Sequence, residues 1–169
     1  MKTERPPDRR KFADARDQIE YLYQKLLYWL YERRDRSRAG VFAQRLANVL
    51  SKSSPGHDAI FPEECWSLIC EAKEDLRAAI KHRENEIRLI KRLHEISRSS
   101  PHEGTVFRLY TCEDLSDRLD LLAVLYHDSG NLDKALATLH ESKQLCKKHR
   151  IEFDGEDVLQ DYLAEAKMN

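Results

Sequence analysis

The chain has 169 residues, of which 35% are charged and only five are glycine. This length suffices for one domain with a sizeable core, and so many charges with so few turn-forming residues favour an all-α protein. Because 29 Lys and Arg nearly balance 30 Asp and Glu, the formal net charge of −1 speaks against a globally basic protein that binds nucleic acid or an acidic surface.

Charge is distributed unevenly along the chain. Lys and Arg outnumber Asp and Glu by 13 to 7 in residues 1–52, but they are outnumbered by 7 to 9 in residues 53–97 and by 9 to 14 in residues 98–169. A basic N-terminal part and an acidic C-terminal part would suit head-to-tail contacts between copies of the chain or a partner with a polarised surface. The competing interpretation is that these charges merely solvate helix faces.

The N-terminal residues 1–8 are expected to form a disordered tail, and they lack the apolar core of a signal peptide. The longest strongly apolar run, residues 121–126, is far shorter than the roughly 20 residues that a membrane span requires. The cysteines show no CxxC pairing, which favours reduced, buried thiols; they are Cys65, Cys70, Cys112 and Cys146. Together these features predict a cytoplasmic protein.

Helical periodicity predicts a first hairpin over residues 9–52. In it, the arginine-rich run 33–38 marks either a tight turn or a bend in one continuous helix. A loop at 51–59, rich in Ser, Pro and Gly, separates it from a second hairpin over 61–97. A break near residues 73–75 would split the second periodic segment into two antiparallel helices, and one unbroken helix is the alternative.

After an irregular stretch at 97–110, Thr111 and Asp114 form a predicted capping box that starts the next helix. The third hairpin covers residues 112–149 and turns at Gly130, because glycine tolerates the left-handed conformation of a helix end. A capping helix follows at 155–167. The pattern as a whole predicts six major helices and a terminal one in a single helical domain over 9–169.

Over the segment 116–149, bulky and small residues occur in a defined order around a turn glycine: Leu119, Leu122, Ala123, Tyr126, Gly130, Ala135, Leu139 and Ser142. This order resembles the tetratricopeptide (TPR) repeat, a helix-turn-helix unit of about 34 residues with bulky and small side chains at fixed positions. Lys147 stands where the repeat usually has proline. The resemblance is weaker over 60–93, where Glu74 replaces the turn glycine and Arg83 replaces an aromatic residue, and it is weakest over 20–53.

The resemblance implies a right-handed stack of antiparallel helix hairpins with a C-terminal capping helix, acting as a non-catalytic protein-interaction scaffold or adaptor. In such arrays, the concave groove is lined mainly by the first helix of each hairpin. The residues placed there are Tyr21, Tyr28, Tyr31, Glu64, Leu68, Glu71, Asp117, Asp120, Val124, His127 and Asp128. Because these positions are acidic and aromatic and include no Lys or Arg, a peptide or protein partner with basic residues is expected.

The sequence carries no motif that indicates catalysis, a cofactor or a metal. Its five glycines are isolated from one another, which speaks against a phosphate-binding loop, and neither GxSxG nor HExxH occurs. A small helical enzyme or metal protein is the alternative, and a nucleic-acid-binding adaptor that uses the arginines of the first hairpin is a second. Self-association through the aromatic first helix, which includes Tyr28, Trp29 and Tyr31, is a further hypothesis.

Overall fold

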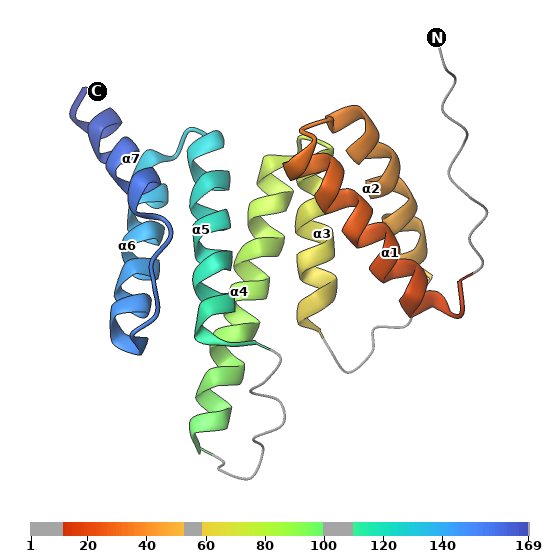
Figure 1. Cartoon of the computed structure of the whole chain (residues 1–169), viewed down its shortest axis with the longest axis horizontal. Coiled ribbons are helices and arrows are strands. Elements are labelled where there is room, and N and C mark those ends of the chain that lie inside the picture. Colours follow the sequence, from red (N-terminus) through yellow and green to blue (C-terminus); the bar gives the residue numbers. More distant parts are fainter. Residues whose placement is uncertain (1–11, 53–58, 100–109, 169) are drawn as a thin grey trace. The chain divides into compact units, whose positions relative to one another are not determined.

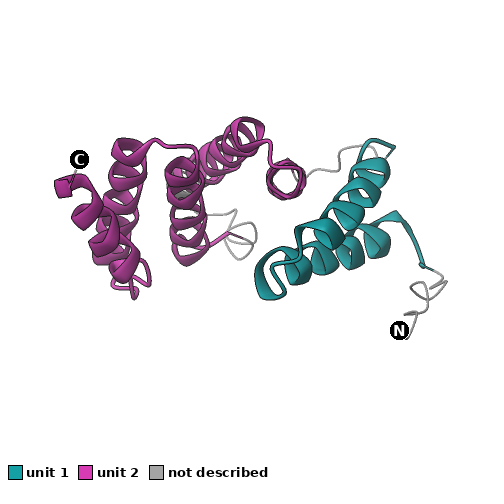
Figure 2. Ribbon diagram, turned by 90° about the horizontal axis from the view of Figure 1, so that it is seen from above, with its two compact units in different colours: residues 1–54 teal, residues 55–169 magenta. Residues whose placement is uncertain are grey.

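The computed structural model describes residues 12–52, 59–99 and 110–168, and it divides the chain into two compact units, residues 1–54 and 55–169 (Figures 1 and 2). Every regular element within the described ranges is helical, which confirms the all-α prediction. The predicted tail at the N-terminus and most of the two predicted loops lie outside the described residues.

The first unit is a helical hairpin. Its elements are α1 (Ala15–Leu27), a π-helical turn (Tyr28–Glu32) and α2 (Arg36–Leu50). The Asp14 side chain starts α1 by accepting a hydrogen bond from the backbone N–H of Asp17, and Asp35 caps α2 through the N–H of Arg38. Between the helices, Arg34 adopts a left-handed conformation with φ of 49°. The chain therefore turns in the arginine-rich run, and the alternative of one continuous bent helix is wrong.

Leucines of the first helix pack against alanines of the second in this unit. The buried apolar residues are Leu22, Leu26, Leu30, Ala39, Ala43, Leu46 and Ala47. Ala39 and Ala43 are completely buried, and their small side chains let the two helices approach closely.

The second unit begins with two helices, α3 (Ile60–Ala72) and α4 (Leu76–Ser99), so the alternative of one unbroken helix is wrong. At the turn, Glu74 takes a left-handed conformation with φ of 62°, and the N–H of Asp75 donates to the carbonyl of Cys70 at 2.9 Å. Asp75 then caps α4 by accepting from the N–H of Ala78 at 3.1 Å. The turn thus forms without glycine, at a backbone cost of roughly 1–2 kcal/mol for the left-handed residue.

The third hairpin consists of α5 (Cys112–Asp128) and α6 (Leu132–His149), and α5 packs beside α4 (Figure 1). The predicted capping box is confirmed. Thr111 Oγ1 accepts from the N–H of Asp114 at 3.1 Å, while Asp114 Oδ2 accepts from the N–H of Thr111 at 2.6 Å. Gly130 turns the chain with φ of 79°.

Small side chains line the crossing of α5 and α6. Ala123, Ala135 and Ser142 are all fully buried, and Ser142 Oγ lies 2.8 Å from Ser116 Oγ on the facing helix. These contacts explain why positions 123, 135 and 142 carry small residues, since larger side chains would push the two helices apart.

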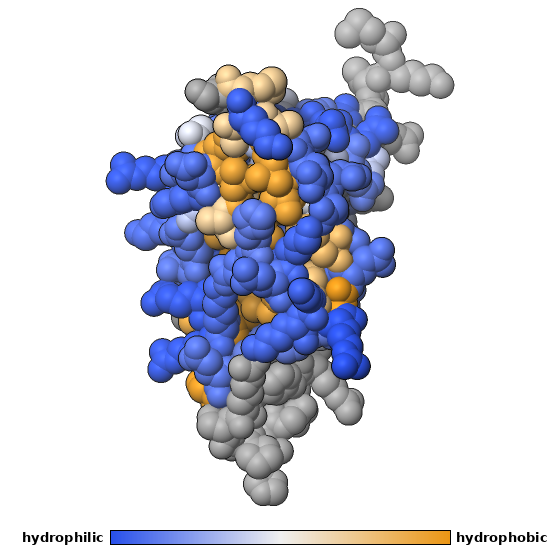
Figure 3. All heavy atoms as spheres, turned by 90° about the vertical axis from the view of Figure 1, so that its left-hand side faces the viewer, coloured by the Kyte–Doolittle hydropathy of each residue, from blue (hydrophilic) through white to orange (hydrophobic). Residues whose placement is uncertain are grey.

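The last helix, α7 (Glu156–Met168), packs on the third hairpin. Leu159 and Tyr162 are buried in the core cluster. Figure 3, which faces α6 and α7, shows apolar side chains between hydrophilic ones on this end of the unit. The partly buried apolar residues that α6 and α7 add to the core are Leu132, Leu136, Leu145, Val158 and Leu163. The core is therefore covered only in part at this end.

The four cysteines are free thiols, but they differ in burial. Cys65 and Cys146 are buried, as predicted. Cys70 and Cys112 are only half-buried, because each lies near a helix end instead of within a core-facing stripe. Burial raises the pKa of Cys70 above its usual range, which keeps this thiol protonated and poorly reactive at neutral pH.

Candidate functional site

Five of the predicted groove residues lie on one side of α5. Asp117 and Asp128 are exposed, Asp120 and His127 are half-buried, and Val124 is 39% exposed. Their spacing of mostly three or four positions places them on successive turns of the same side of the helix. We call the surface formed by these five residues the α5 face.

Two carboxylates of the α5 face, those of Asp117 and Asp120, are only partly stabilised in their ionised form. Burial raises the pKa of Asp120, a hydrogen bond from Ser142 opposes the rise, and the nearby Asp117 and Asp154 add to it. Burial also raises the pKa of Asp117; the positive charge of Arg118 opposes this rise, and repulsion by neighbouring carboxylates adds to it. One oxygen of Asp120, Oδ1, is buried and has no hydrogen-bond partner among the described residues. The α5 face therefore carries negative charge that its surroundings compensate only in part.

The C-terminal segment borders the α5 face. His127 Nε2 lies 2.9 Å from Glu165 Oε2, and the His127 ring stacks on Tyr162 with centroids 4.2 Å apart. At Gly155, a Cβ atom would lie 3.3 Å from Asp120 Oδ2 and 2.8 Å from Cζ of Phe153. His127 thus holds α7 in place, and the backbone before α7 passes close to Asp120.

The three predicted residues of α3 do not form an open surface. Leu68 is 1% exposed and belongs to the core, because the packing of α3 against α4 turns it inward. The Glu64 side chain is 13% exposed, and its Oε1 lies 3.5 Å from Arg118 Nη2, so its charge is balanced within the protein. Glu71 is half-buried. The structure therefore leaves α5, and not α3, as the helix that presents carboxylates.

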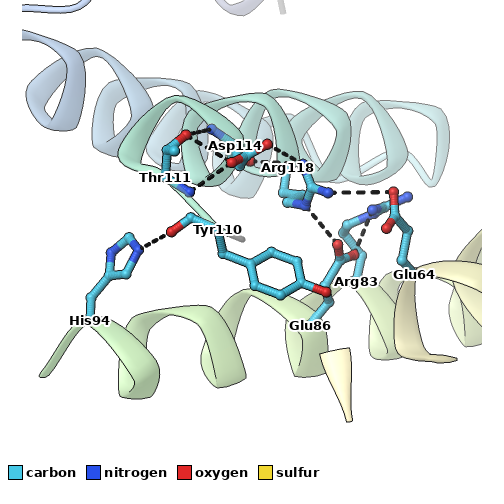
Figure 4. A network of polar contacts seen from close by, with 8 residues as sticks. All are labelled: Glu64, Arg83, Glu86, His94, Tyr110, Thr111, Asp114 and Arg118. Carbon is cyan, nitrogen blue, oxygen red and sulfur yellow. Dashed lines mark hydrogen bonds and ion pairs between the residues drawn. The ribbon is translucent and has the colours of Figure 1, made fainter. Parts of the chain in front are cut away.

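A buried network of charged side chains joins α3, α4 and α5 (Figure 4). Arg83 and Glu86 are 1% and 0% exposed, and Arg83 Nη1 donates to Glu86 Oε2 at 2.5 Å. Arg118 of α5 donates from Nε to the other oxygen of Glu86 at 2.8 Å, and it also contacts Glu64 and Asp114. Burial still raises the pKa of Glu86, although both arginines oppose the rise. The network is an internal cross-link between hairpins.

Sequence reasoning did not find this network. In the sequence, Arg83 is only a departure from the resemblance, and no motif singles out Glu86. The available signal was their position: both fall on the same three- and four-residue stripe of α4 as the buried residues Ala79, Ile87 and Ile90. Charged residues on a core stripe are rarely buried unless they are paired.

The predicted tyrosines belong to the first unit and form a surface of different character. Tyr21 and Tyr28 are half-buried, and Lys25 Nζ lies 5.8 and 5.9 Å from their ring centroids. Tyr31 is 38% exposed and lies in the π-helical turn. Lys25 therefore places a cation beside both rings, whereas the predicted groove was expected to contain no Lys or Arg.

The raised pKa of Asp120 predicts that Asp120→Asn increases the free energy of unfolding at about pH 7. When a carboxyl pKa is higher in the folded chain than in the unfolded chain, its ionised form opposes folding, and this penalty vanishes once the group is protonated in both states. Urea unfolding should therefore show a gain at about pH 7 that shrinks towards zero at about pH 3. A variant that is less stable at neutral pH would show that the Asp120 charge is fully compensated.

No protein-family model, curated protein or solved structure matches this chain. In the part of the chain that the structure describes, no three His, Cys, Asp or Glu side chains are grouped so that they could hold a metal ion. No helix of that part combines the length and the apolar character needed to cross a bilayer. The α5 face, with its partly compensated carboxylates and its exposed Val124, is the candidate binding surface.

Proposed function

We propose that the chain is a non-catalytic protein-interaction module, built as a TPR-like array, that binds a basic segment of a partner protein on the α5 face. The observation that carries this proposal is the crowding of Asp117, Asp120 and Asp154, with Asp120 Oδ1 buried and without a hydrogen-bond partner among the described residues. A Lys or Arg side chain from a partner would pair with the exposed carboxylate of Asp117 and so offset the crowded negative charge, without contacting the buried Oδ1 atom of Asp120.

The dimensions of the α5 face define the ligand further. Asp117 and Asp128 are 11 positions apart on α5, which corresponds to roughly 16 Å along the helix axis. An extended peptide covers this distance with about five residues. Leu121 and Val124, which are 36% and 39% exposed, lie between the two carboxylates and offer apolar contacts. The favoured ligand is an extended segment with two basic residues about five positions apart and apolar residues between them.

A fluorescein-labelled synthetic peptide with this pattern tests the proposal by fluorescence anisotropy with the full chain. The double variant Asp117→Lys/Asp128→Lys should bind it at least about tenfold more weakly, because two attractions become two repulsions. Both residues are exposed, so the fold should tolerate the change, whereas Glu64 and Asp120 are too deeply placed for charge reversal.

The matched control is Glu95→Lys/Glu141→Lys, which changes the net charge equally but alters α4 and α6. This variant should keep its affinity for the peptide within about twofold. Equal weakening by both double variants would show that only net charge matters, and the α5 face would lose its role. Far-UV circular dichroism checks that each variant is folded.

The alternatives have less support from the described residues. For nucleic acid, the arginine-rich turn is partly occupied: the Arg38 guanidinium lies 4.5 Å from the Trp29 ring centroid and 3.4 Å from Asp35 Oδ2. A ring already covered by an arginine of its own chain is a poor stacking platform for bases. For a metal protein, the described side chains supply no ligand cluster.

A further inference from the structure

A concave surface of the unit 55–169 lies on the side of α5 opposite to the α5 face. Two adjoining clefts of about 630 and 320 Å³ run between α4 and α6. Residues of α5 that are buried or nearly so form the floor: Leu115, Leu119, Leu122 and Tyr126. Lys91 of α4 and Glu141 of α6 line both clefts and meet at 2.5 Å between Nζ and Oε1. We call this surface the α4–α6 cleft.

The floor residues and the α5 face occupy different sides of the same helix. Successive residues of an α-helix are rotated by about 100°, so Leu115, Leu119 and Leu122 cluster in one direction while Asp117 and Val124 point roughly the opposite way. A ligand in the α4–α6 cleft would therefore not compete with one on the α5 face. Binding in the cleft is thus independent of the basic partner proposed for the α5 face.

The rim of the α4–α6 cleft carries cations for which the described residues provide no carboxylate partner. Arg88 donates only to the neutral side chain of Asn85, at 3.1 Å, and neither Arg92 nor Lys148 has an ion-pair partner among the described residues. By contrast, the Glu84 carboxylate accepts a hydrogen bond from the Tyr126 hydroxyl, and Glu141 pairs with Lys91.

The local charge of the cleft differs in sign from that of its unit. Four basic residues and three acidic ones line it, a balance of 4 − 3 = +1, with histidine taken as neutral. Over residues 55–169, Lys and Arg number 16 and Asp and Glu 23, a balance of 16 − 23 = −7. A basic cleft on an acidic unit selects a ligand that carries carboxylates and disfavours a second basic one.

We propose that the α4–α6 cleft docks an acidic amphipathic helix of a partner protein. The cleft follows α4 from Glu84 to Glu95, 11 positions or roughly 16 Å, which matches about three turns of a docked helix. Its apolar floor suits leucine-like anchors at helical spacing, and Arg88, Arg92 and Lys148 can pair with glutamates that flank those anchors. A phosphate backbone fits less well, because it offers no apolar side chains to the floor formed by Leu115, Leu119 and Leu122.

Two stapled, fluorescein-labelled helical peptides of about three turns test the proposal by anisotropy with the full chain. They share the same leucines but carry either glutamate or glutamine at the flanking positions. The glutamate peptide should bind about tenfold more tightly than the glutamine peptide. Equal binding of the two would overturn the proposal.

Charge reversal locates the site. Arg88→Glu/Arg92→Glu should weaken the glutamate peptide about tenfold, whereas Arg77→Glu/Lys81→Glu, an equal change at exposed positions of α4 outside the cleft, should leave it within about twofold. Equal weakening by both variants would overturn the proposal. So would displacement of the glutamate peptide by a single-stranded oligonucleotide whose own binding depends on Arg88 and Arg92.

Competition with the basic peptide that tests the α5 face shows whether binding in the α4–α6 cleft is independent of the proposed function. In excess, it should not displace the glutamate peptide, because the two bind opposite sides of α5. Asp117→Lys/Asp128→Lys should likewise leave the glutamate peptide bound at least as tightly as in the unaltered chain. Displacement, or a loss of affinity in that variant, would place the glutamate peptide outside the cleft and overturn the proposal.

Discussion

Glu86→Ala is expected to lower the free energy of unfolding of residues 55–169 by about 3–5 kcal/mol, the usual cost of removing one partner from a buried ion pair. The substitution leaves Arg83, whose side chain is 1% exposed, without its carboxylate. It also removes the acceptor of Arg118 Nε, and with it one of the hydrogen bonds that join α4 and α5. Arg83 Nε already lacks a hydrogen-bond partner in the described structure. The substitution would therefore remove the acceptor of Nη1 as well, and the buried guanidinium would lose its hydrogen bond to Glu86.

The measurement requires a signal from this unit alone. The chain has two tryptophans, Trp29 in the first unit and Trp66 in the second. In a Trp29→Phe background, the fluorescence of Trp66 during urea unfolding reports the second unit. Glu141→Ala, which removes the exposed partner of Lys91, is the matched control and should cost no more than about 1 kcal/mol.

Replacing the pair distinguishes burial of charge from loss of packing. Arg83→Met/Glu86→Leu removes both charges but keeps most of the apolar volume, so it should be considerably more stable than Glu86→Ala. If Glu86→Ala costs no more than Glu141→Ala, the network contributes little to stability. If the double variant is the least stable of all, the side chains matter through their packing and hydrogen bonds, and not through paired charge.

Ala135→Leu is expected to cost about 1–3 kcal/mol of unfolding free energy in the same background. Ala135 is completely buried where α6 crosses α5, opposite the equally buried Ala123. Three additional carbon atoms can fit only if the helices separate, which would also stretch the 2.8 Å contact between Ser116 and Ser142. Overpacking of this kind forces backbone shifts as well as strained rotamers.

Ala137→Leu is the control for this prediction, because it makes the same chemical change two residues further on the exposed side of α6. It should alter stability by no more than about 0.5 kcal/mol. Similar losses in both variants would mean that helix propensity or solubility, and not the close crossing, explains the effect. An unchanged Ala135→Leu variant would show that α5 and α6 can separate at little cost.

Local features of the fold were predictable because their causes lie within a few residues. The capping box of Thr111 and Asp114 needs only two side chains three positions apart, and it formed as expected. The turn at 73–75 was harder, since Glu74 occupies the left-handed position where glycine would have given a clear signal. Helical periodicity on both sides still favoured two helices, and packing of α3 on α4 offsets the strain.

The candidate site was predictable only where one helix supplies it. The residues of α5 share a side of the helix because helical geometry dictates it, whatever the neighbours are. For α3, the sequence could not reveal that Leu68 turns into the core or that Glu64 faces Arg118, 54 positions away. Such contacts depend on how hairpins pack, and packing is a property of several segments at once.

The sequence by itself determined the all-α class, the positions of the helices and the acidic side of α5, since periodicity, capping and charge act over short distances. The tertiary structure decided which charges are surface and which are structural. It buried Arg83 and Glu86 as an ion pair, left Asp120 Oδ1 without a partner among the described residues, and formed a basic cleft on the side of α5 opposite to the α5 face. The physical reason is desolvation: the free energy of a charge depends on its surroundings, and only packing determines these.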